Sequence, residues 1–144
     1  MLSLTGEYAL RAIVYLTQNA HRCPIPGREV AEKAGIPAKY LSNILGDLVR
    51  HGVLDSSRGK RGGFRLRRSA QEITLYDVLR PFEQFDEVRC PFGNDQCNEK
   101  NPCLAHAQWK HVVETERRFL CDTSVYDVAV KAPEPMNQTP ESES

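Results

Sequence analysis

The stretch that decides the fold reads Arg28-Glu-Val-Ala-Glu-Lys-Ala-Gly-Ile-Pro-Ala-Lys-Tyr-Leu-Ser-Asn-Ile-Leu-Gly-Asp-Leu-Val-Arg50. Its first part, 28–34, has apolar residues at helical spacing and ends before Gly35, a residue type that favours helix termination. Its second part follows Pro37 and places apolar residues at positions 41, 44, 45 and 48. Two short helices joined by such a turn predict a helix-turn-helix.

The second of these helices is the expected recognition helix, whose first residues lie nearest the base edges of DNA. If its apolar stripe is buried, the free face carries Lys39, Tyr40, Ser42 and Asn43. An asparagine can pair bidentately with adenine, and a lysine can bind phosphate or guanine. Any surface helix carries such residues, so this signal is weak alone. Two further candidate DNA contacts at the ends of the unit are Arg28 and Arg50.

A basic ribbon follows and strengthens the prediction. Residues 53–56 and 64–67 read as short strands, and the glycine-rich segment between them reads as a hairpin tip. Six of the eleven residues 58–68 are basic and none is acidic. Such a ribbon after a helix-turn-helix is a wing, which binds the DNA backbone or minor groove. The candidate contacts are Arg58, Lys60, Arg61, Gly62, Gly63 and Arg65, with the two glycines allowing close approach to the duplex.

The remaining helices complete a mainly α fold with a small β wing. We expect an amphipathic helix over 5–19 with Thr5 as its N-cap, and another from Thr74, where Asp77 completes a capping box. A long helix should start at Leu104, and a short last helix should follow Ser124. The apolar face of the long helix is formed by Trp109, Val112, Val113, Phe119 and Leu120, which we interpret as the contact of a homodimer.

These elements divide the chain into four parts. Residues 1–85 form the winged helix-turn-helix domain, and 86–103 form a loop rich in asparagine, glycine and proline that contains three cysteines. Residues 104–131 form the dimerisation helix and the last helix, and 132–144 form a disordered tail with three glutamates and no basic residue.

Charge distribution and cysteine usage narrow the class of function. Residues 28–68 hold ten Lys and Arg against four Asp and Glu, although the net charge of the chain is zero. This clustering suits a polyanionic partner such as double-stranded DNA. No apolar run suggests a membrane span or a signal peptide, so we expect a cytoplasmic protein with reduced thiols. Nucleophile-elbow, phosphate-loop and paired-carboxylate motifs are not found, so we do not expect an enzyme.

The cysteine loop has the pattern Cys90-x6-Cys97-x5-Cys103-x2-His106. Thiolates with an imidazole suit an iron–sulfur cluster, and zinc is the second reading because structural zinc sites favour closer cysteine pairs. Three buried cysteines without metal are the third reading, which the polar loop disfavours. The fourth ligand is either His106 or Glu7, the latter supplied by a partner subunit, although a glutamate in a first helical turn ordinarily interacts with the helix dipole. We expect Cys23, Cys121, His21, His51 and His111 not to bind metal.

Five motifs together resemble the Rrf-two family of winged-helix regulators over about residues 1–130. They are Leu4-Thr-Gly-Glu-Tyr-Ala-Leu-Arg11, Ile36-Pro-Ala-Lys-Tyr-Leu41, Arg58-Gly-Lys-Arg-Gly-Gly-Phe64, Thr74-Leu-Tyr-Asp-Val-Leu79 and Cys103-Leu-Ala-His-Ala-Gln-Trp109. The resemblance implies a homodimer, commonly a repressor, whose iron–sulfur cluster controls its affinity for a double-stranded DNA operator.

The resemblance also implies a ligand set. Cys90, Cys97 and Cys103 match the cysteine ligands; the IscR-like branch uses a histidine placed as His106 is, and the NsrR-like branch uses an acidic residue matched by Glu7. The spacing of Cys103 and His106 favours the IscR-like branch and therefore a [2Fe–2S] over a [4Fe–4S] cluster. The alternatives are the same regulator with a thiol-redox or zinc site, and a protein-docking module that does not bind DNA.

Overall fold

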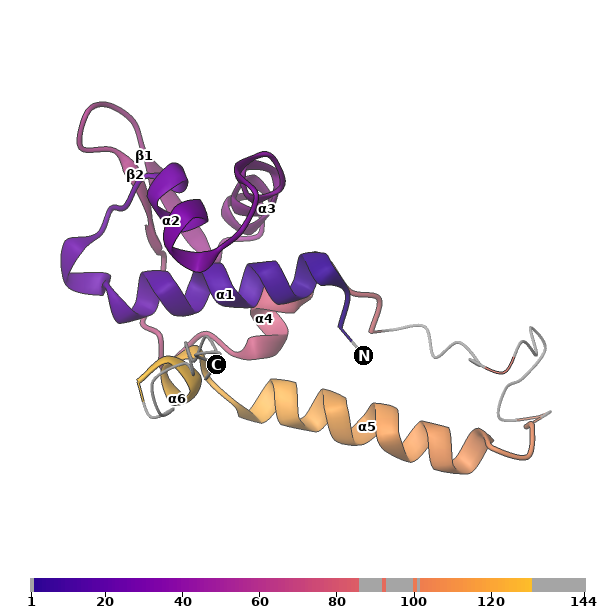
Figure 1. Cartoon of the computed structure of the whole chain (residues 1–144). Helices are drawn as coiled ribbons and strands as arrows, with labels where there is room; N and C mark the ends of the chain where they lie inside the picture. The colour runs from indigo at the N-terminus through magenta and orange to yellow at the C-terminus, as the bar shows by residue number, and fades with distance from the viewer. Residues whose placement is uncertain (1, 86–91, 93–99, 101, 131–144) are drawn as a thin grey trace, which may run out of the picture.

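Helix α1 (Leu4–Gln18) lies at the centre of the fold in the computed structural model, which describes residues 2–85, 92, 100 and 102–130. Helices α2 (Gly27–Ala34) and α3 (Ala38–Arg50) and the wing lie on one side of α1 (Figure 1). Helices α4 (Leu75–Leu79) and α6 (Val125–Ala129) lie on its other side, and α5 (His106–Asp122) extends away from them. A short 3₁₀ turn, η1 (Ala20–Arg22), follows α1.

One hydrophobic core joins these elements and confirms the predicted helical stripes. The apolar positions 41, 44, 45 and 48 of α3 are all buried, and so are Val30 and Ala31 of α2. They pack with Ala9, Ala12, Ile13 and Leu16 of α1. Val125 of α6 and Leu120 of α5 belong to the same core. The last helix of the predicted 104–131 unit therefore packs against the part of the chain that carries the helix-turn-helix.

The helix ends follow local capping chemistry, with one difference from the prediction. Helix α1 begins at Leu4, and its N-cap is Ser3 rather than Thr5, because Ser3 Oγ accepts a hydrogen bond from the Gly6 amide at 3.1 Å. The capping box of Thr74 and Asp77 at α4 is confirmed, and a second capping box, of Ser124 and Asp127, begins α6 where the last helix was predicted. Helix α2 ends as predicted at Gly35, whose φ of 67° is the left-handed conformation that glycine adopts without strain.

The wing is a two-stranded antiparallel sheet of β1 (Leu54–Ser57) and β2 (Gly63–Leu66). Its register pairs Leu54 with Leu66 and Ser57 with Gly63. The wing is fastened to the body through an isolated bridge between Ile25 and Phe64, whose amides and carbonyls exchange hydrogen bonds of 2.9 and 3.1 Å. The direction of the basic hairpin is therefore set by the segment that precedes α2.

Gly63 is required for this attachment. A Cβ atom at position 63 would lie 2.2 Å from the Ile25 carbonyl carbon, which is backbone and cannot move aside. We predict that Gly63→Ala lowers the free energy of unfolding by about 1–3 kcal/mol. The control is Gly46→Ala within α3, where the nearest atom to the new Cβ is 3.5 Å away in the flexible Arg50 side chain. That change should raise stability by about 0.5–1 kcal/mol. Urea denaturation of both variants measures the difference, and equal stabilities would contradict the assigned role of Gly63.

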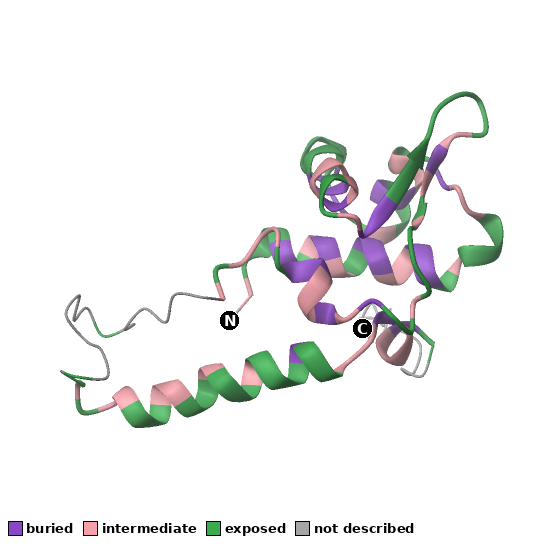
Figure 2. Cartoon of the chain, turned by 180° about the vertical axis from the view of Figure 1, so that it is seen from behind, coloured by how far each residue is buried: buried purple, intermediate pink, exposed green. Residues whose placement is uncertain are grey.

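Helix α5 is the least buried of the described α-helices. Leu120 is its one buried residue, near the end that joins α6 (Figure 2). Val112 and Phe119 are 52% and 58% exposed, and Leu104 just before the helix is fully exposed. The predicted apolar face therefore contributes Leu120 to the core, leaves Trp109 and Val113 half-buried, and leaves Val112 and Phe119 exposed. Within the described residues, none of the helices combines the length and apolar character of a membrane span.

Candidate DNA interface and metal site

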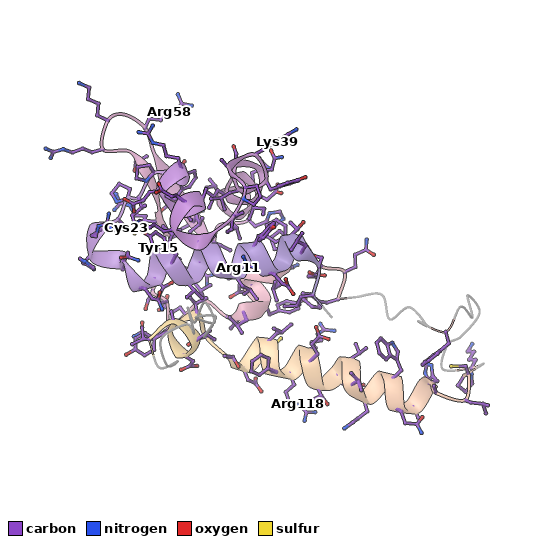
Figure 3. All side chains as sticks on the ribbon, viewed as in Figure 1. Arg11, Tyr15, Cys23, Lys39, Arg58 and Arg118 are labelled. Atoms are coloured by element: carbon purple, nitrogen blue, oxygen red, sulfur yellow. The ribbon has the colours of Figure 1, made fainter. Side chains whose placement is uncertain are left out.

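The predicted recognition residues share one exposed helix face. Lys39, Tyr40, Ser42 and Asn43 are all exposed on the first turns of α3, while the opposite stripe is buried in the core. Lys39 and Arg58 lie on the same side of the molecule, away from α5 and its Arg118 (Figure 3). The start of the recognition helix and the wing can therefore face one duplex together.

The positive charge of this side is largely available to phosphates. Lys39, Arg58, Lys60 and Arg61 are exposed and form no salt bridge with another described residue. Arg28, at the start of α2, and Arg65, on β2, are likewise exposed and outside the described salt bridges. Arg50 differs, because it pairs with Asp47 one turn earlier on α3. A DNA contact by Arg50 would have to compete with that carboxylate.

The two wing glycines have internal roles in addition to the predicted one. Gly63 is buried against the Ile25 backbone. A Cβ at Gly62 would lie 2.3 Å from the Ser57 carbonyl oxygen, so this position closes the hairpin tip. The packing of the protein itself thus explains both glycines, and their contact with DNA stays a prediction.

Two of the four predicted metal ligands lie within the described part of the chain. Cys103 is half-buried, and its carbonyl accepts a 3.1 Å hydrogen bond from the amide of His106, the first residue of α5. This turn keeps the thiol and the imidazole on one short segment, and the His106 Nε2 atom is buried. Cys90 and Cys97 lie outside the described residues. A thiolate and an imidazole so placed fit an iron–sulfur or zinc site by donor chemistry.

The other residues weighed as ligands are separate from this turn. Glu7 is exposed in the first turn of α1, where its side chain is accessible to a second subunit. Cys121 is exposed on α5 and Cys23 is half-buried after η1. The Cys23 thiol donates to the carbonyls of Leu16 and Asn19 at 3.7 and 3.6 Å. Burial raises the pKa of the Cys23 thiol, which Arg65 and Arg22 offset only in part.

Sequence reasoning missed two polar contacts that link distant segments. The Glu29 carboxylate of α2 accepts hydrogen bonds from Tyr15 at 2.9 Å and from Arg22 at 2.8 Å, which ties α1 to the helix-turn-helix. The Tyr15 hydroxyl is the main cause of the lowered pKa of Glu29. In the second contact, Glu83 accepts two hydrogen bonds from Ser3, 80 residues away. Neither pair has a recognisable local spacing.

The fold and sequence are similar to those of known regulators. The Rrf2 (Rrf-two) family model, described as iron-dependent transcriptional regulator, matches residues 2–131. The regulator IscR of Klebsiella pneumoniae (strain 342) is 32% identical over 120 residues, which cover 83% of this chain and 73% of that protein.

Two solved structures share the fold. The global cysteine regulator CymR of B. subtilis superposes with a TM-score of 0.79 at 22% identity, over 92% of this chain and 98% of that one. IscR of T. potens superposes with a TM-score of 0.74 at 23% identity, over 93% and 89% of the two chains. The family model spans the helix-turn-helix, the wing, the cysteine loop and α5, so the chain belongs to the Rrf2 family of transcriptional regulators.

Proposed function

We propose that the protein is a repressor whose affinity for a double-stranded DNA operator depends on an iron–sulfur cluster. The observation that carries the DNA-binding part is that the exposed Lys39 of α3 lies on the same side of the molecule as Arg58 of the cationic hairpin tip (Figure 3). Asn43 and Lys39 would read base edges, and Arg58, Lys60 and Arg61 would bind phosphates or enter the minor groove. In vitro selection from random double-stranded DNA, followed by titration at several salt concentrations, tests this part.

The sensing part is supported by the donor chemistry of the cysteine loop and by the likeness to IscR. Cys90, Cys97 and Cys103 would hold the cluster, with His106 or Glu7 of the partner subunit as fourth ligand. A [2Fe–2S] cluster is favoured, because Cys103 and His106 stand one turn apart as the IscR-like branch requires. When bound, the cluster supplies a centre that responds to iron supply, oxidants or nitric oxide. The chain couples its presence to DNA through the segments that flank the loop, α4 and α5.

A thiol or zinc site in the same loop is the second candidate, motivated by the likeness to a cysteine regulator. Cys23 is a poor candidate for the reactive thiol, because its raised pKa leaves little thiolate at neutral pH. Anaerobic purification with an absorption spectrum and with iron, sulfide and zinc assays separates the candidates. Equal iron and sulfide support the cluster, and a colourless protein with zinc or no metal supports the alternative.

We further propose that α5 forms the contact of a homodimer. Val112 and Phe119 are exposed seven residues apart, two helical turns on one stripe, with the half-buried Trp109 one turn earlier. A second copy would cover this stripe and place two recognition helices for a symmetric operator.

Helix α5 provides its own test of this contact. Phe119→Asp should convert the dimer to a monomer, because a carboxylate buried in an apolar interface is strongly unfavourable. Sedimentation velocity measures the change. The control is Glu114→Lys, which alters charge on the other face of the same helix, where Glu114 is exposed. A Phe119→Asp protein that sediments as the wild type would exclude α5 as the dimer contact.

A further inference from the structure

Glu83 forms an unusual long-range contact just before the cysteine loop. It lies four residues after the end of α4, and its amide donates to the Leu79 carbonyl at 3.0 Å, which holds the turn in place. Its Oε1 atom accepts two hydrogen bonds from Ser3, 2.7 Å from the amide and 2.6 Å from the hydroxyl. Hydrogen bonds to a carboxylate are shorter and stronger than those between neutral groups.

The other end of this contact is the first turn of α1. Ser3 is the N-cap of that helix: its hydroxyl oxygen accepts from the Gly6 amide at 3.1 Å and its carbonyl accepts from the Glu7 amide at 3.0 Å. Glu83 thus binds the residue that closes the N-terminus of α1, where a negative charge also interacts favourably with the helix dipole. The same turn presents Glu7, the alternative fourth ligand.

Gly6 makes room for the carboxylate. A Cβ atom at position 6 would lie 2.4 Å from Glu83 Oε1 and 3.1 Å from the Leu79 side chain. Gly6 is itself buried, so the end of α4 and the start of α1 meet at close range. The segment after α4 and the start of α1 are therefore in direct contact, although they are far apart in the sequence.

Helix α1 extends that unit to the DNA-reading helix. Its residues Ala9, Ala12 and Ile13 share the hydrophobic core with Leu41 and Ile44 of α3. A displacement at Glu83 would move the start of α1, and α1 could not shift without disturbing its packing against α3, since well-packed cores transmit strain. The contact therefore links Glu83, three residues before the predicted cysteine loop, to the helix that packs against α3.

We propose that Glu83 is a positioning residue that couples the state of the cysteine loop to α3 through Ser3 and α1. The proposal rests on the proposed function, because it concerns how the cluster-dependent loop affects DNA affinity. In this proposal Glu83 contacts neither the cluster nor DNA. Its role is to set how strongly cluster binding changes the affinity for the operator.

The test compares operator affinity of cluster-loaded and cluster-free protein for the wild type and for Glu83→Ala. The ratio of the two dissociation constants should fall by about three- to tenfold in the variant. This is part of the total coupling, which is typically about 5- to 150-fold between two linked sites. Iron content and the affinity of the cluster-free protein should stay within about twofold of the wild type. Glu83→Gln, which retains Oε1 as an acceptor, should restore most of the ratio. The matched control is Gln84→Ala, an exposed neighbour that should leave the ratio unchanged.

Hydrogen exchange supplies a readout that does not need the cluster. In cluster-free Glu83→Ala, the amides of Ser3 and Gly6 should exchange faster than in the wild type, because the cap of α1 has lost its anchor. If exchange accelerates and the ratio of dissociation constants does not change, the contact is only structural and the proposal fails. If Glu83→Ala does not fold, Ser3→Ala removes one of the two bonds and serves the same comparison.

The wild-type measurement separates this proposal from the proposed function. A wild type whose affinity is the same with and without cluster overturns the proposed function, and the coupling with it, before any variant is measured. A wild type that responds to the cluster together with a Glu83→Ala protein that responds equally overturns only the coupling.

Discussion

Cys103→Ala is expected to abolish the visible absorption of the anaerobically purified protein and to reduce its iron and sulfide to background. Cluster ligation depends on thiolate donors, and Cys103 is the one described cysteine on the turn that leads to His106, since Cys23 follows η1 and Cys121 lies near the end of α5. Operator affinity should then shift to that of the cluster-free protein, by about 5- to 150-fold if the coupling is of ordinary size. Absorption spectra, iron and sulfide assays and anaerobic DNA titration measure the three quantities.

The matched control is Cys121→Ala. Cys121 is exposed on α5 and is not a predicted ligand, so this variant should keep its colour and its affinity. In the same set, His106→Ala and Glu7→Ala identify the fourth ligand, because only the ligand's replacement should alter the spectrum of the bound cluster. A Cys103→Ala protein with wild-type iron and sulfide would remove this residue from the site.

Replacing Arg58, Lys60 and Arg61 together with glutamine is expected to weaken operator binding by roughly 10²-fold near physiological salt. Each lost phosphate contact should also reduce the slope of log affinity against log salt by about 0.9, so the triple change should reduce it by about 3 in each subunit and by about 5 in the proposed homodimer. The physical reason is that fewer counterions are released when fewer phosphates are neutralised. Fluorescence anisotropy titrations between about 50 and 200 mM salt measure both effects.

Arg118→Gln provides the control for charge alone. Arg118 is exposed on α5, on the opposite side from Lys39 and Arg58, so its loss should leave the slope almost unchanged (Figure 3). A triple wing variant with the wild-type salt slope would show that the hairpin tip does not contact the operator.

Much of the fold followed from local patterns. The stripe at 41, 44, 45 and 48 is buried as predicted, and the capping boxes at Thr74 and Ser124 start helices where expected. These features depend on residues within one or two turns of each other, so spacing is sufficient to predict them. The N-cap of α1 was predicted two residues late, at Thr5 instead of Ser3, because both residue types can cap a helix; in the structure Ser3 caps α1 and also donates to Glu83.

Part of the candidate DNA interface could likewise be predicted from local patterns, and part could not. The exposed face of α3 and the basic hairpin could be predicted, because exposure follows from the opposite face being apolar. The requirement for glycine at position 63 could not be predicted, because it is the backbone of Ile25 that leaves no room for a side chain there. The role of α5 was predicted from its apolar residues, but which of them is buried depends on how α5 packs against α4, and the structure buries Leu120 while Phe119 stays exposed.

The sequence by itself determined the helix-turn-helix, the wing, the clustering of positive charge and the donor chemistry of the cysteine loop, because each is a property of residues close together in the chain. Only the tertiary structure decided that Glu83 binds Ser3 and that Glu29 binds Tyr15 and Arg22. Such contacts join segments up to 80 residues apart, and their geometry exists only once the core has brought α1 against its neighbours.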